Sequence, residues 1–561
     1  MPDAQSPRDG PERSDSRGNR RHSAHGGHGL RRAMWTPVDI LPDEEPDFDN
    51  RDTRTNTTLD PAPTIAHTPT AMTLRSGATS RPGRLPATPD RLRADLAAVV
   101  GGENLIDQAA ALMVYECDGY TLERAAPDLV VLPGSPEEVA RVVRVLADAG
   151  VPFVPRGAGT GLSGGTLPVA APVMVCTSRL QTIESVDVRN RRVVAQAGVV
   201  NLWISRRVQA DGLLYAPDPS SQGACTIGGN VAENSGGPHT LKYGVTTNHV
   251  LGVELVLSSG EVVRLGGAVE ERPGYDLTGL VVGSEGTFGI VTRATLRLTR
   301  TPESYRTLLA VFDSVDAASE AVSGIIATGI VPAALEMMDH LILEAVESAF
   351  HAGLPTDAGA VLLVELDGAE AGLEPLAARV REVCTRHGAR EVRLAATDAE
   401  RALLWKARKR AFGAVGRLAP NYCTQDGVVP RTRVPEIVRA IAATAERHRL
   451  RIGNVFHAGD GNIHPIILFD ERNADEVRRV LEAGREILEA CVALGGSVTG
   501  EHGIGVEKMA QMPLLFSPED ILAMTRVRAV FDPEQRSNPH KIFPDAKVCV
   551  ETRVPRRQAA M

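Results

Sequence analysis

Two histidines and a Glu–His pair are spaced in the C-terminal third of the chain in a way that could bind a metal ion. His457 and His464 flank AGDGNI, a turn-like stretch between the apolar segments NVF and PIILF. If the chain folds back there as a hairpin, both imidazoles can reach one ion. Glu501 and His502 follow in GSVTGEHGIGVEK, which we interpret as a glycine-rich strand end. A metal ion bound by two imidazoles and one carboxylate keeps a coordination position open. His502, beside that set, is then free to act as a base.

The spacing alone leaves open which of Glu501 and His502 faces the metal, and each histidine could instead be a hydrogen-bonded structural residue. A further candidate is Arg408, in LLWKARKRAF at residues 403–412. Its guanidinium can hold a carboxylate through two parallel hydrogen bonds, a geometry that lysine does not match. The alternative for Arg408 is a solvated helix face, and we expect Trp405 to pack in the core.

Three stretches rich in small residues lie upstream, at 155–165, 218–237 and 283–298. The first contains a literal GxGxxG, but a proline-containing stretch and then a strand pattern follow it. A nicotinamide-binding Rossmann unit requires a helix at that point, so this interpretation fails. Small residues still allow backbone N–H groups to converge on an anion. Each stretch alone could be an ordinary connection; together they predict a groove for an extended ligand with a central pyrophosphate.

The patterns around these residues indicate a mixed α and β protein. DLVVLP reads as a strand, and the helix pattern that follows has Ser135 as N-cap, with Glu138 three residues later. Gly150 ends that helix before a second strand, VPFV. Beyond about residue 302, repeated strand–helix units predict an α+β layer with an antiparallel sheet. Residues 473–496 predict an amphipathic helix that ends at two glycines.

Length and composition limit the function classes. The 561 residues require more than one domain, and 43% apolar and 23% charged residues are typical of a soluble globular protein. A net charge of −9 without a basic patch argues against nucleic acid as a partner, and no apolar run is long enough to span a membrane. Seven scattered cysteines without a CxxC suit reduced thiols in the cytoplasm. We expect tails at 1–88 and 547–561 and two domains, at 89–301 (core about 125–301) and 302–546.

Over roughly residues 95–545 the chain resembles the FAD-linked 2-hydroxyacid dehydrogenases and oxidases. This family includes the catalytic subunit of bacterial glycolate oxidase, D-lactate dehydrogenase and D-2-hydroxyglutarate dehydrogenase. The resemblance implies a two-subdomain FAD-binding domain of the vanillyl-alcohol-oxidase (PCMH) type, followed by an α+β cap domain with an antiparallel sheet. The motifs that carry it are PRGAGTGLSGG, DPSSQGACTIGGNVAENSGG, LKYG, GSEGTFGIVT, HAGDGNIHP, GEHGIG and SNPHKIFP.

The resemblance also implies roles for individual residues. His457, His464 and Glu501 would bind a divalent metal, usually zinc, while His502 is the base and Arg408 holds the substrate carboxylate. FAD would bind without a covalent bond, because nothing local favours attachment through His239. The FAD-binding residues implied are Pro155, Arg156, Gly157, Ala158, Gly159, Thr160, Gly161, Ser163, Ser220, Gly223, Thr226, Gly229, Asn230, Ser235, Gly236, Ile290 and Asn538.

The chain departs from the family pattern at four places. His540 replaces a glycine of the terminal motif, and Phe412, Thr424 and Ile466 stand where the hydroxyglutarate enzymes carry threonine, lysine and asparagine. Two of these three replacements are apolar, which argues against a second substrate carboxylate and favours glycolate or D-lactate.

Two other function classes stay open at this point, a non-catalytic flavoprotein electron-transfer subunit and a non-haem iron oxygenase. A same-fold flavoenzyme with other chemistry, such as an ether-lipid synthase or an aryl-alcohol oxidase, is a third. The electron acceptor is also open, with an iron–sulfur partner among the candidates. The expected location is the cytoplasm, and a peripheral position at the membrane is a further alternative.

Overall fold

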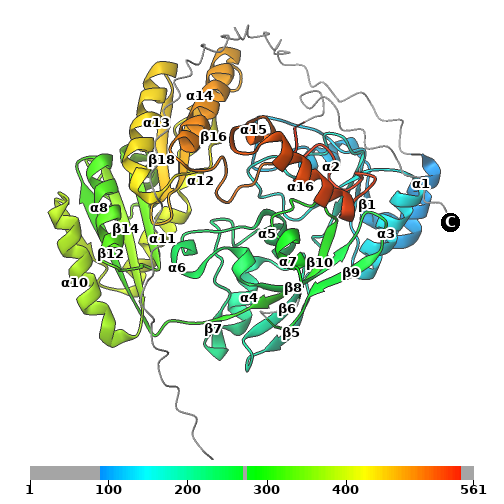
Figure 1. Ribbon diagram of the computed structural model, residues 1–561, viewed down its shortest axis with the longest axis horizontal. Coiled ribbons are helices and arrows are strands. Elements are labelled where there is room, and N and C mark those ends of the chain that lie inside the picture. Colours follow the sequence, from blue (N-terminus) through cyan, green and yellow to red (C-terminus); the bar gives the residue numbers. More distant parts are fainter. Residues whose placement is uncertain (1–88, 270–273, 545–561) are drawn as a thin grey trace, which may run out of the picture. The chain divides into compact units, whose positions relative to one another are not determined.

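The computed structural model describes residues 89–269 and 274–544 (Figure 1). The two expected tails, at 1–88 and 547–561, lie outside the described residues. The expected combination of a two-part α and β unit followed by an antiparallel sheet with helices is confirmed. Within the described part of the chain, every helix is too short or too polar to cross a bilayer.

The first sheet has four strands in the order β1-β2-β4-β3, and β2, β4 and β3 run parallel. Ser135 caps α3 by accepting a hydrogen bond from the backbone N–H of Glu138 at 3.2 Å, as the capping pattern predicts. Val139, Val142 and Leu146 on one face of α3 are buried against the sheet. The elements are α1 (Asp90–Val100), β1 (Leu105–Ile106), α2 (Ala109–Leu112), β2 (Leu129–Val131), α3 (Pro136–Asp148), β3 (Phe153–Arg156) and β4 (Val173–Cys176).

The second sheet has five antiparallel strands in the order β5-β6-β10-β8-β9. Helices α4 and α5 pack on it around Ile204, Ile227 and Val231. The elements are β5 (Ile183–Asp187), β6 (Arg192–Gln196), α4 (Asn201–Val208), β7 (Leu213–Leu214), α5 (Ile227–Glu233), α6 (Thr240–Tyr243), β8 (Val250–Val256), β9 (Val262–Gly266), α7 (Leu277–Val281), β10 (Ile290–Arg297) and β11 (Thr299–Arg300).

The third sheet has eight strands, all of them paired antiparallel, in the order β15-β12-β14-β13-β18-β19-β16, with β17 also paired to β19. The strands are β12 (Ser304–Phe312), β13 (Ala334–Asp339), β14 (Ala360–Gly368), β15 (Glu391–Leu394), β16 (Asn421–Thr424), β17 (Gly427–Val428), β18 (Arg451–His457) and β19 (Asn462–Phe469).

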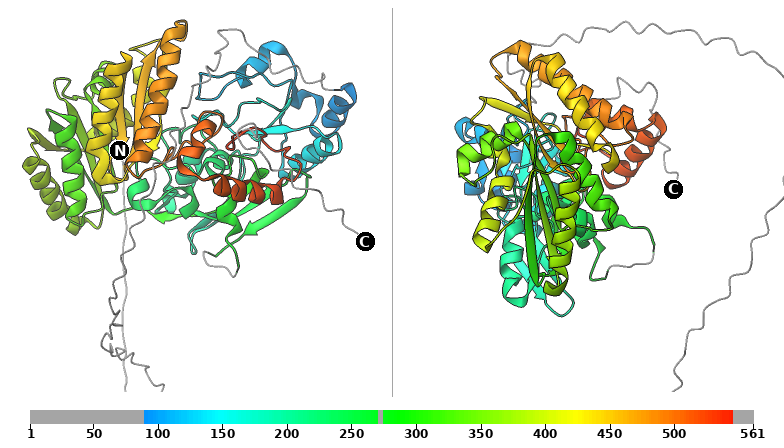
Figure 2. Two further views of the ribbon diagram at one scale, coloured as in Figure 1. Left: turned by 45° about the horizontal axis from the view of Figure 1, so that its top comes forward. Right: turned by 90° about the vertical axis from the view of Figure 1, so that its left-hand side faces the viewer.

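Helices cover both faces of this third sheet (Figures 1 and 2). Helices α8, α10, α13 and α14 pack on one face, and α9, α11 and α12 pack on the other. Because side chains alternate along a strand, each strand sends every second residue to each core. The helices are α8 (Val315–Ala327), α9 (His340–Phe350), α10 (Glu370–Arg386), α11 (Asp398–Lys409), α12 (Ala411–Val415), α13 (Val434–His448) and α14 (Ala474–Ala493).

After α14 the chain returns to the first half of the structure. The rings of Phe531 and Phe288 stack at 4.5 Å, and Phe153 exchanges backbone hydrogen bonds with Arg536 and Asn538. His540, which replaces the glycine of the family motif, has a positive φ of 56°, a conformation that favours glycine. The expected domain boundaries stay predictions. The helices of this segment are α15 (Met512–Leu515) and α16 (Pro518–Phe531).

Candidate active site

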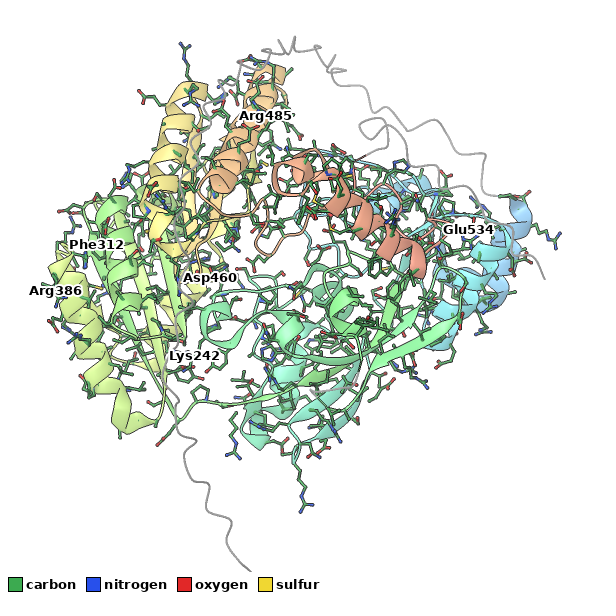
Figure 3. The ribbon with its side chains drawn as sticks, in the orientation of Figure 1. Lys242, Phe312, Arg386, Asp460, Arg485 and Glu534 are labelled. Atoms are coloured by element: carbon green, nitrogen blue, oxygen red, sulfur yellow. The ribbon has the colours of Figure 1, made fainter. Side chains whose placement is uncertain are left out.

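His457 and His464 lie on one β-hairpin, as predicted. His457 is the last residue of β18, His464 is the third residue of β19, and the register pairs Val455 with His464 and His457 with Asn462. This antiparallel register directs both imidazoles to the sheet face that carries α9, α11 and α12. The ring centroids are 5.1 Å apart and nearly perpendicular. Figure 3 labels Asp460 in the connecting turn and Lys242 on α6.

Glu501 joins these histidines from a distant segment. Its Oε1 lies 3.1 Å from Nε2 of His457 and 3.2 Å from Nε2 of His464. The three side chains offer ligand atoms that all lie within 4.8 Å of one another. The expectation of a strand end at Glu501 and His502 is wrong, because both residues lie in a loop. Their backbone N–H groups donate to the Asp426 carboxylate instead of to a neighbouring strand.

The charges of this cluster are strongly coupled. Burial opposes a charged His457, but Glu336 and Glu501 outweigh it and raise its pKa well above the ordinary value. Burial likewise favours a neutral Glu501, yet His457 and His464 hold its pKa well below the usual range. Two imidazole nitrogens and one carboxylate oxygen, nearly out of contact with solvent, are donors that fit a divalent cation such as zinc. A cation bound there would take the place of the protons that these groups now share.

His502 lies beside this cluster on the wall of a cavity. Its ring stacks on that of His464, with centroids 4.8 Å apart and planes 7° from parallel. Burial lowers the pKa of His502 to about 4, so the imidazole is neutral. Its Nδ1 is buried and has no hydrogen-bond partner within residues 89–269 and 274–544.

Arg408 is fully buried behind this wall, on α11. Its guanidinium forms an ion pair with Glu336, and Glu336 also accepts a hydrogen bond from Nδ1 of His457 at 2.9 Å. Among the described residues, Nε and Nη1 of this guanidinium have no hydrogen-bond partner. The alternative of a solvated helix face is therefore wrong. Trp405 is buried in the core, as expected.

The first two glycine-rich segments, 155–165 and 218–237, line the cavity that His457, Glu501 and His502 also line, whereas the third, 283–298, lines a second cavity. The second cavity shares Gly157 and Gly229 with the first. Of the residues expected to bind FAD, the first cavity is lined by Gly157, Ala158, Gly159, Thr160, Gly161, Ser220, Thr226, Gly229, Asn230 and Ser235. The second is lined by Pro155, Arg156, Gly157, Gly229, Ile290 and Asn538. Ser163, Gly223 and Gly236 line neither cavity.

These walls fit an extended anionic cofactor. A Cβ on Gly157 would clash with Oγ1 of Thr226, and a Cβ on Gly159, where φ is +69°, would clash with the Arg156 guanidinium. Glycine at these positions therefore allows two loops and a cationic side chain to meet around one groove. Asn538 helps to close the groove, donating from Nδ2 to the backbone oxygens of Gly165 and Glu285.

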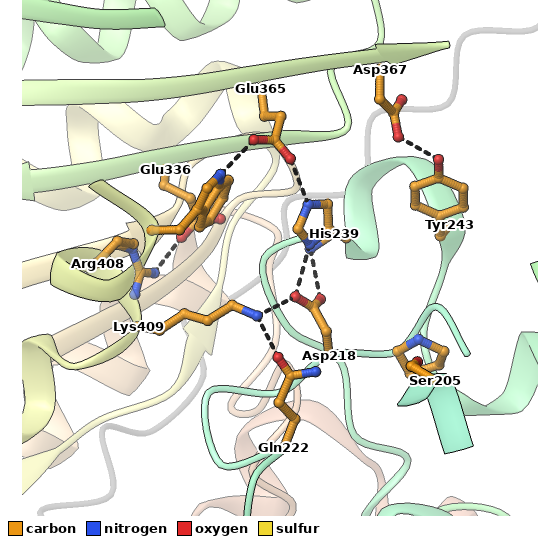
Figure 4. A network of polar contacts seen from close by, with 12 residues as sticks. Ser205, Asp218, Gln222, His239, Tyr243, Glu336, Glu365, Asp367, Arg408 and Lys409 are labelled. Carbon is orange, nitrogen blue, oxygen red and sulfur yellow. Dashed lines mark hydrogen bonds and ion pairs between the residues drawn. The ribbon is translucent and has the colours of Figure 1, made fainter. Parts of the chain in front are cut away.

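Beyond residue 302, three residues line this cavity that the sequence analysis did not place there: Lys409, Phe412 and Tyr422. Nζ of Lys409 donates to Oδ2 of Asp218 and to Oε1 of Gln222, both at 2.7 Å (Figure 4). All three lie within 14 residues after Arg408, a residue already expected at the site, so their proximity in sequence could have indicated them. Only the folded chain shows which of the side chains in this segment face the cavity.

His239 lies in the same polar network (Figure 4). Its Nδ1 lies 2.8 Å from Asp218 and its Nε2 lies 3.3 Å from Glu365. Burial opposes a charged ring, but Asp218 and Glu365 raise the pKa of His239 to about 10. Both ring nitrogens therefore face carboxylates.

Comparison with known proteins identifies the family of the chain. The family model "FAD linked oxidases, C-terminal domain" matches residues 301–542, and the model "FAD binding domain" matches residues 127–266. Glycolate oxidase subunit GlcD of Escherichia coli (strain K12) is 47% identical over 452 residues, which cover 81% of this chain and 91% of that protein. D-lactate dehydrogenase of Anaerostipes hadrus is 32% identical over 428 residues, covering 75% and 90%.

A solved structure supports the fold. 4-Ethylphenol oxidase from Gulosibacter chungangensis superimposes with a TM-score of 0.67 at 18% identity, covering 82% of this chain and 98% of that one. The matched FAD-binding domain and the two relatives define an FAD-linked oxidoreductase. The chain belongs to the FAD-linked oxidase family that includes the glycolate oxidase subunit and D-lactate dehydrogenase named above. Family membership argues against a flavin-free iron oxygenase.

Proposed function

We propose that this protein oxidises a small 2-hydroxy acid, of the glycolate or D-lactate type, to the 2-oxo acid with FAD as the electron acceptor. One observation carries the proposal: His457 and Glu501 of the His457–His464–Glu501 cluster, together with His502, line the same cavity as the glycine-rich segments 155–165 and 218–237. A binding site for a flavin and a set of metal-type ligands thus meet in one space. The names of the two relatives, a glycolate oxidase subunit and a D-lactate dehydrogenase, support the same reaction class.

Two bound groups complete the proposed site. FAD, held without a covalent bond by the glycine-rich walls, supplies a two-electron acceptor. A divalent metal, for which zinc fits the donor set, supplies a Lewis acid that polarises the substrate hydroxyl. His457, His464 and Glu501 hold the metal in this proposal and leave one side of it open toward the cavity.

The chain's own residues handle the proton and the carboxylate. His502 faces the cavity as a neutral imidazole and takes the proton of the substrate hydroxyl, a contribution of about 10²–10⁴ in rate. Arg408 is proposed to hold the substrate carboxylate, since its buried guanidinium has nitrogens without hydrogen-bond partners beside the cluster. Substrate would have to draw that guanidinium toward the cavity from its present contact with Glu336.

The cavity favours a short substrate. The Phe412 ring lines it and meets His464 edge-on at 6.1 Å. Ile466 and Thr424 are buried and do not line it. These three residues supply no cation or amide for a second carboxylate, so comparable turnover of 2-hydroxyglutarate and D-lactate would contradict the assignment. The final electron acceptor, with an iron–sulfur partner among the candidates, is a separate question.

An anaerobic spectral titration tests the proposal. Purified protein is mixed with D- and L-2-hydroxy acids of increasing length, and the flavin absorbance is recorded. We expect the flavin bands to bleach with glycolate or D-lactate and the 2-oxo acid to form in equal amount. His502→Ala should retain FAD and metal but lose nearly all bleaching, whereas His340→Ala, on the exposed side of α9, should not change it. Full-rate bleaching in His457→Ala or Glu501→Ala treated with a chelator would remove the metal from the mechanism.

A further inference from the structure

Asp426 lies just after β16, is fully buried, and binds the loop that carries Glu501 and His502. Its Oδ2 accepts hydrogen bonds from Oγ1 of Thr499 at 2.6 Å, from the N–H of Gly500 at 2.9 Å and from the N–H of His502 at 3.0 Å. The N–H of Glu501 lies 3.3 Å from both carboxylate oxygens. One carboxylate therefore binds three consecutive backbone N–H groups and fixes the path of the loop.

Lys508 neutralises this carboxylate. Its side chain is also buried, and its Nζ lies 3.3 Å from Oδ2 of Asp426 and 3.3 Å from the backbone oxygen of Gly503. An ionised carboxylate can accept several hydrogen bonds at once, and a buried charge requires a partner of opposite sign. The pair therefore keeps Asp426 in the anionic form that the loop needs.

Asp426 also faces two imidazoles. Its Oδ1 lies 3.8 Å from Nδ1 of His464, and Asp426, His464 and His502 each offer a ligand-type atom within 4.8 Å of the others. The Nδ1 atoms of both histidines are buried without a hydrogen-bond partner. Nε2 of His464 is directed to Glu501. The oxygens of Asp426 already serve the loop and Lys508, so a second metal ion here would have to displace Lys508.

We propose that Asp426 is a positioning residue for two members of the site at once, the ligand His464 and the base His502. It holds the loop through backbone N–H groups, and its negative charge lies beside Nδ1 of His464, whose Nε2 faces Glu501. This inference rests on the proposed function. Glu336 has a narrower role, since among the described residues its carboxylate makes polar contacts with the proposed ligand His457 and with Arg408 and none with His502.

Glu336 provides the matched control. Asp426→Asn and Glu336→Gln make the same chemical change, a buried carboxylate to the corresponding amide. On FAD-loaded, metal-free protein, zinc affinity is measured by competition with a chromophoric chelator, and kcat is then measured at saturating zinc. We expect zinc affinity to fall about 10–100-fold in both variants. We expect kcat to fall at least about 100-fold in Asp426→Asn, and less than tenfold in Glu336→Gln, since only Asp426 supports the base.

Loss of bound FAD would show that Asp426→Asn is misfolded. Thr499→Val is a milder variant that tests the same interaction in that case. It removes one donor to Asp426 and should lower zinc affinity and kcat severalfold with FAD retained. Wild-type values of both quantities in Asp426→Asn, or in Thr499→Val if the first variant fails to fold, overturn the inference alone. A wild-type protein that neither binds zinc nor bleaches with 2-hydroxy acids overturns the proposed function and this inference with it, since no ligand and base would remain to be positioned.

Discussion

Glu507 is a buried carboxyl group whose ionisation should weaken the fold as the pH rises. Its side chain is 7% exposed, its Oε1 accepts one hydrogen bond from Gln425 at 3.3 Å, and its Oε2 has no hydrogen-bond partner. Burial raises the pKa of Glu507 from the ordinary 4.5 to about 7, although Lys508 opposes the shift. A raised pKa means that the folded state holds the proton more tightly than the unfolded state does. The stabilisation is therefore complete below pH 4.5 and is lost as the pH rises toward 7.

The size of the effect follows from the two pKa values. Between pH 5 and pH 8, a shift from 4.5 to about 7 removes about 2.5 kcal/mol from the free energy of unfolding. Glu507→Gln cannot ionise and therefore lacks this pH dependence. Its amide does place a donor near Lys508, which adds a cost that is the same at every pH. The difference between variant and wild type should thus shift by about 2.5 kcal/mol in favour of the variant across this range.

Urea unfolding of the FAD-loaded protein at pH 5, 6, 7 and 8 measures this difference. Glu303→Gln makes the same change at an exposed position and provides the control. A Glu507→Gln curve that runs parallel to wild type, within about 0.5 kcal/mol over the whole range, would show that Glu507 is ionised throughout. The raised pKa of Glu507 in the folded protein would then be wrong.

Three further perturbations test the walls of the site. A Cβ on Gly236 would lie 2.8 Å from Oε2 of Glu501, so Gly236→Ala should lower zinc affinity about tenfold with FAD retained, as chelator competition measures. Lys409→Met removes the ammonium bound to the buried Asp218 and should lower the free energy of unfolding by about 1–3 kcal/mol in urea. Phe412→Ala should raise the ratio of kcat/KM for a six-carbon over a three-carbon 2-hydroxy acid about tenfold, and an unchanged ratio would show that this ring does not limit substrate length.

Elements with local signals were predictable from the sequence. The helix after Ser135 and the helix at 473–496 follow from capping residues and from the spacing of apolar residues, which act within a few positions of the chain. The hairpin of His457 and His464 follows from its turn. The Glu501–His502 segment was misread as a strand end because its backbone donors bond to Asp426, about 75 residues away in sequence, and no local pattern reveals that partner.

The residues of the candidate site also fall into those that a local sequence pattern indicates and those that it does not. Histidines, glycines and Glu501 belong to compact motifs, whereas Glu336, Asp426 and Lys409 do not. Glu336 did leave a signal, since a charged residue that points inward from an apolar strand requires a buried partner. Arg408 was expected at the substrate and is buried against Glu336, because the sheet places that carboxylate directly under α11.

The loop after Glu501 links the two walls of the cavity and makes the site preorganised. From the first half of the chain, the Glu285 carboxylate accepts the N–H groups of Ile504 and Gly505, both at 2.7 Å, and the Ser163 oxygen accepts those of Val506 and Glu507. From the third sheet, Asp426 holds the preceding residues. These bonds run to the backbone of the loop, so the position of the loop depends on both halves of the structure. His502 and Glu501, the proposed base and the proposed metal ligand, are therefore held in place beside the cofactor groove before substrate arrives, as the proposed hydride transfer over a short distance would require.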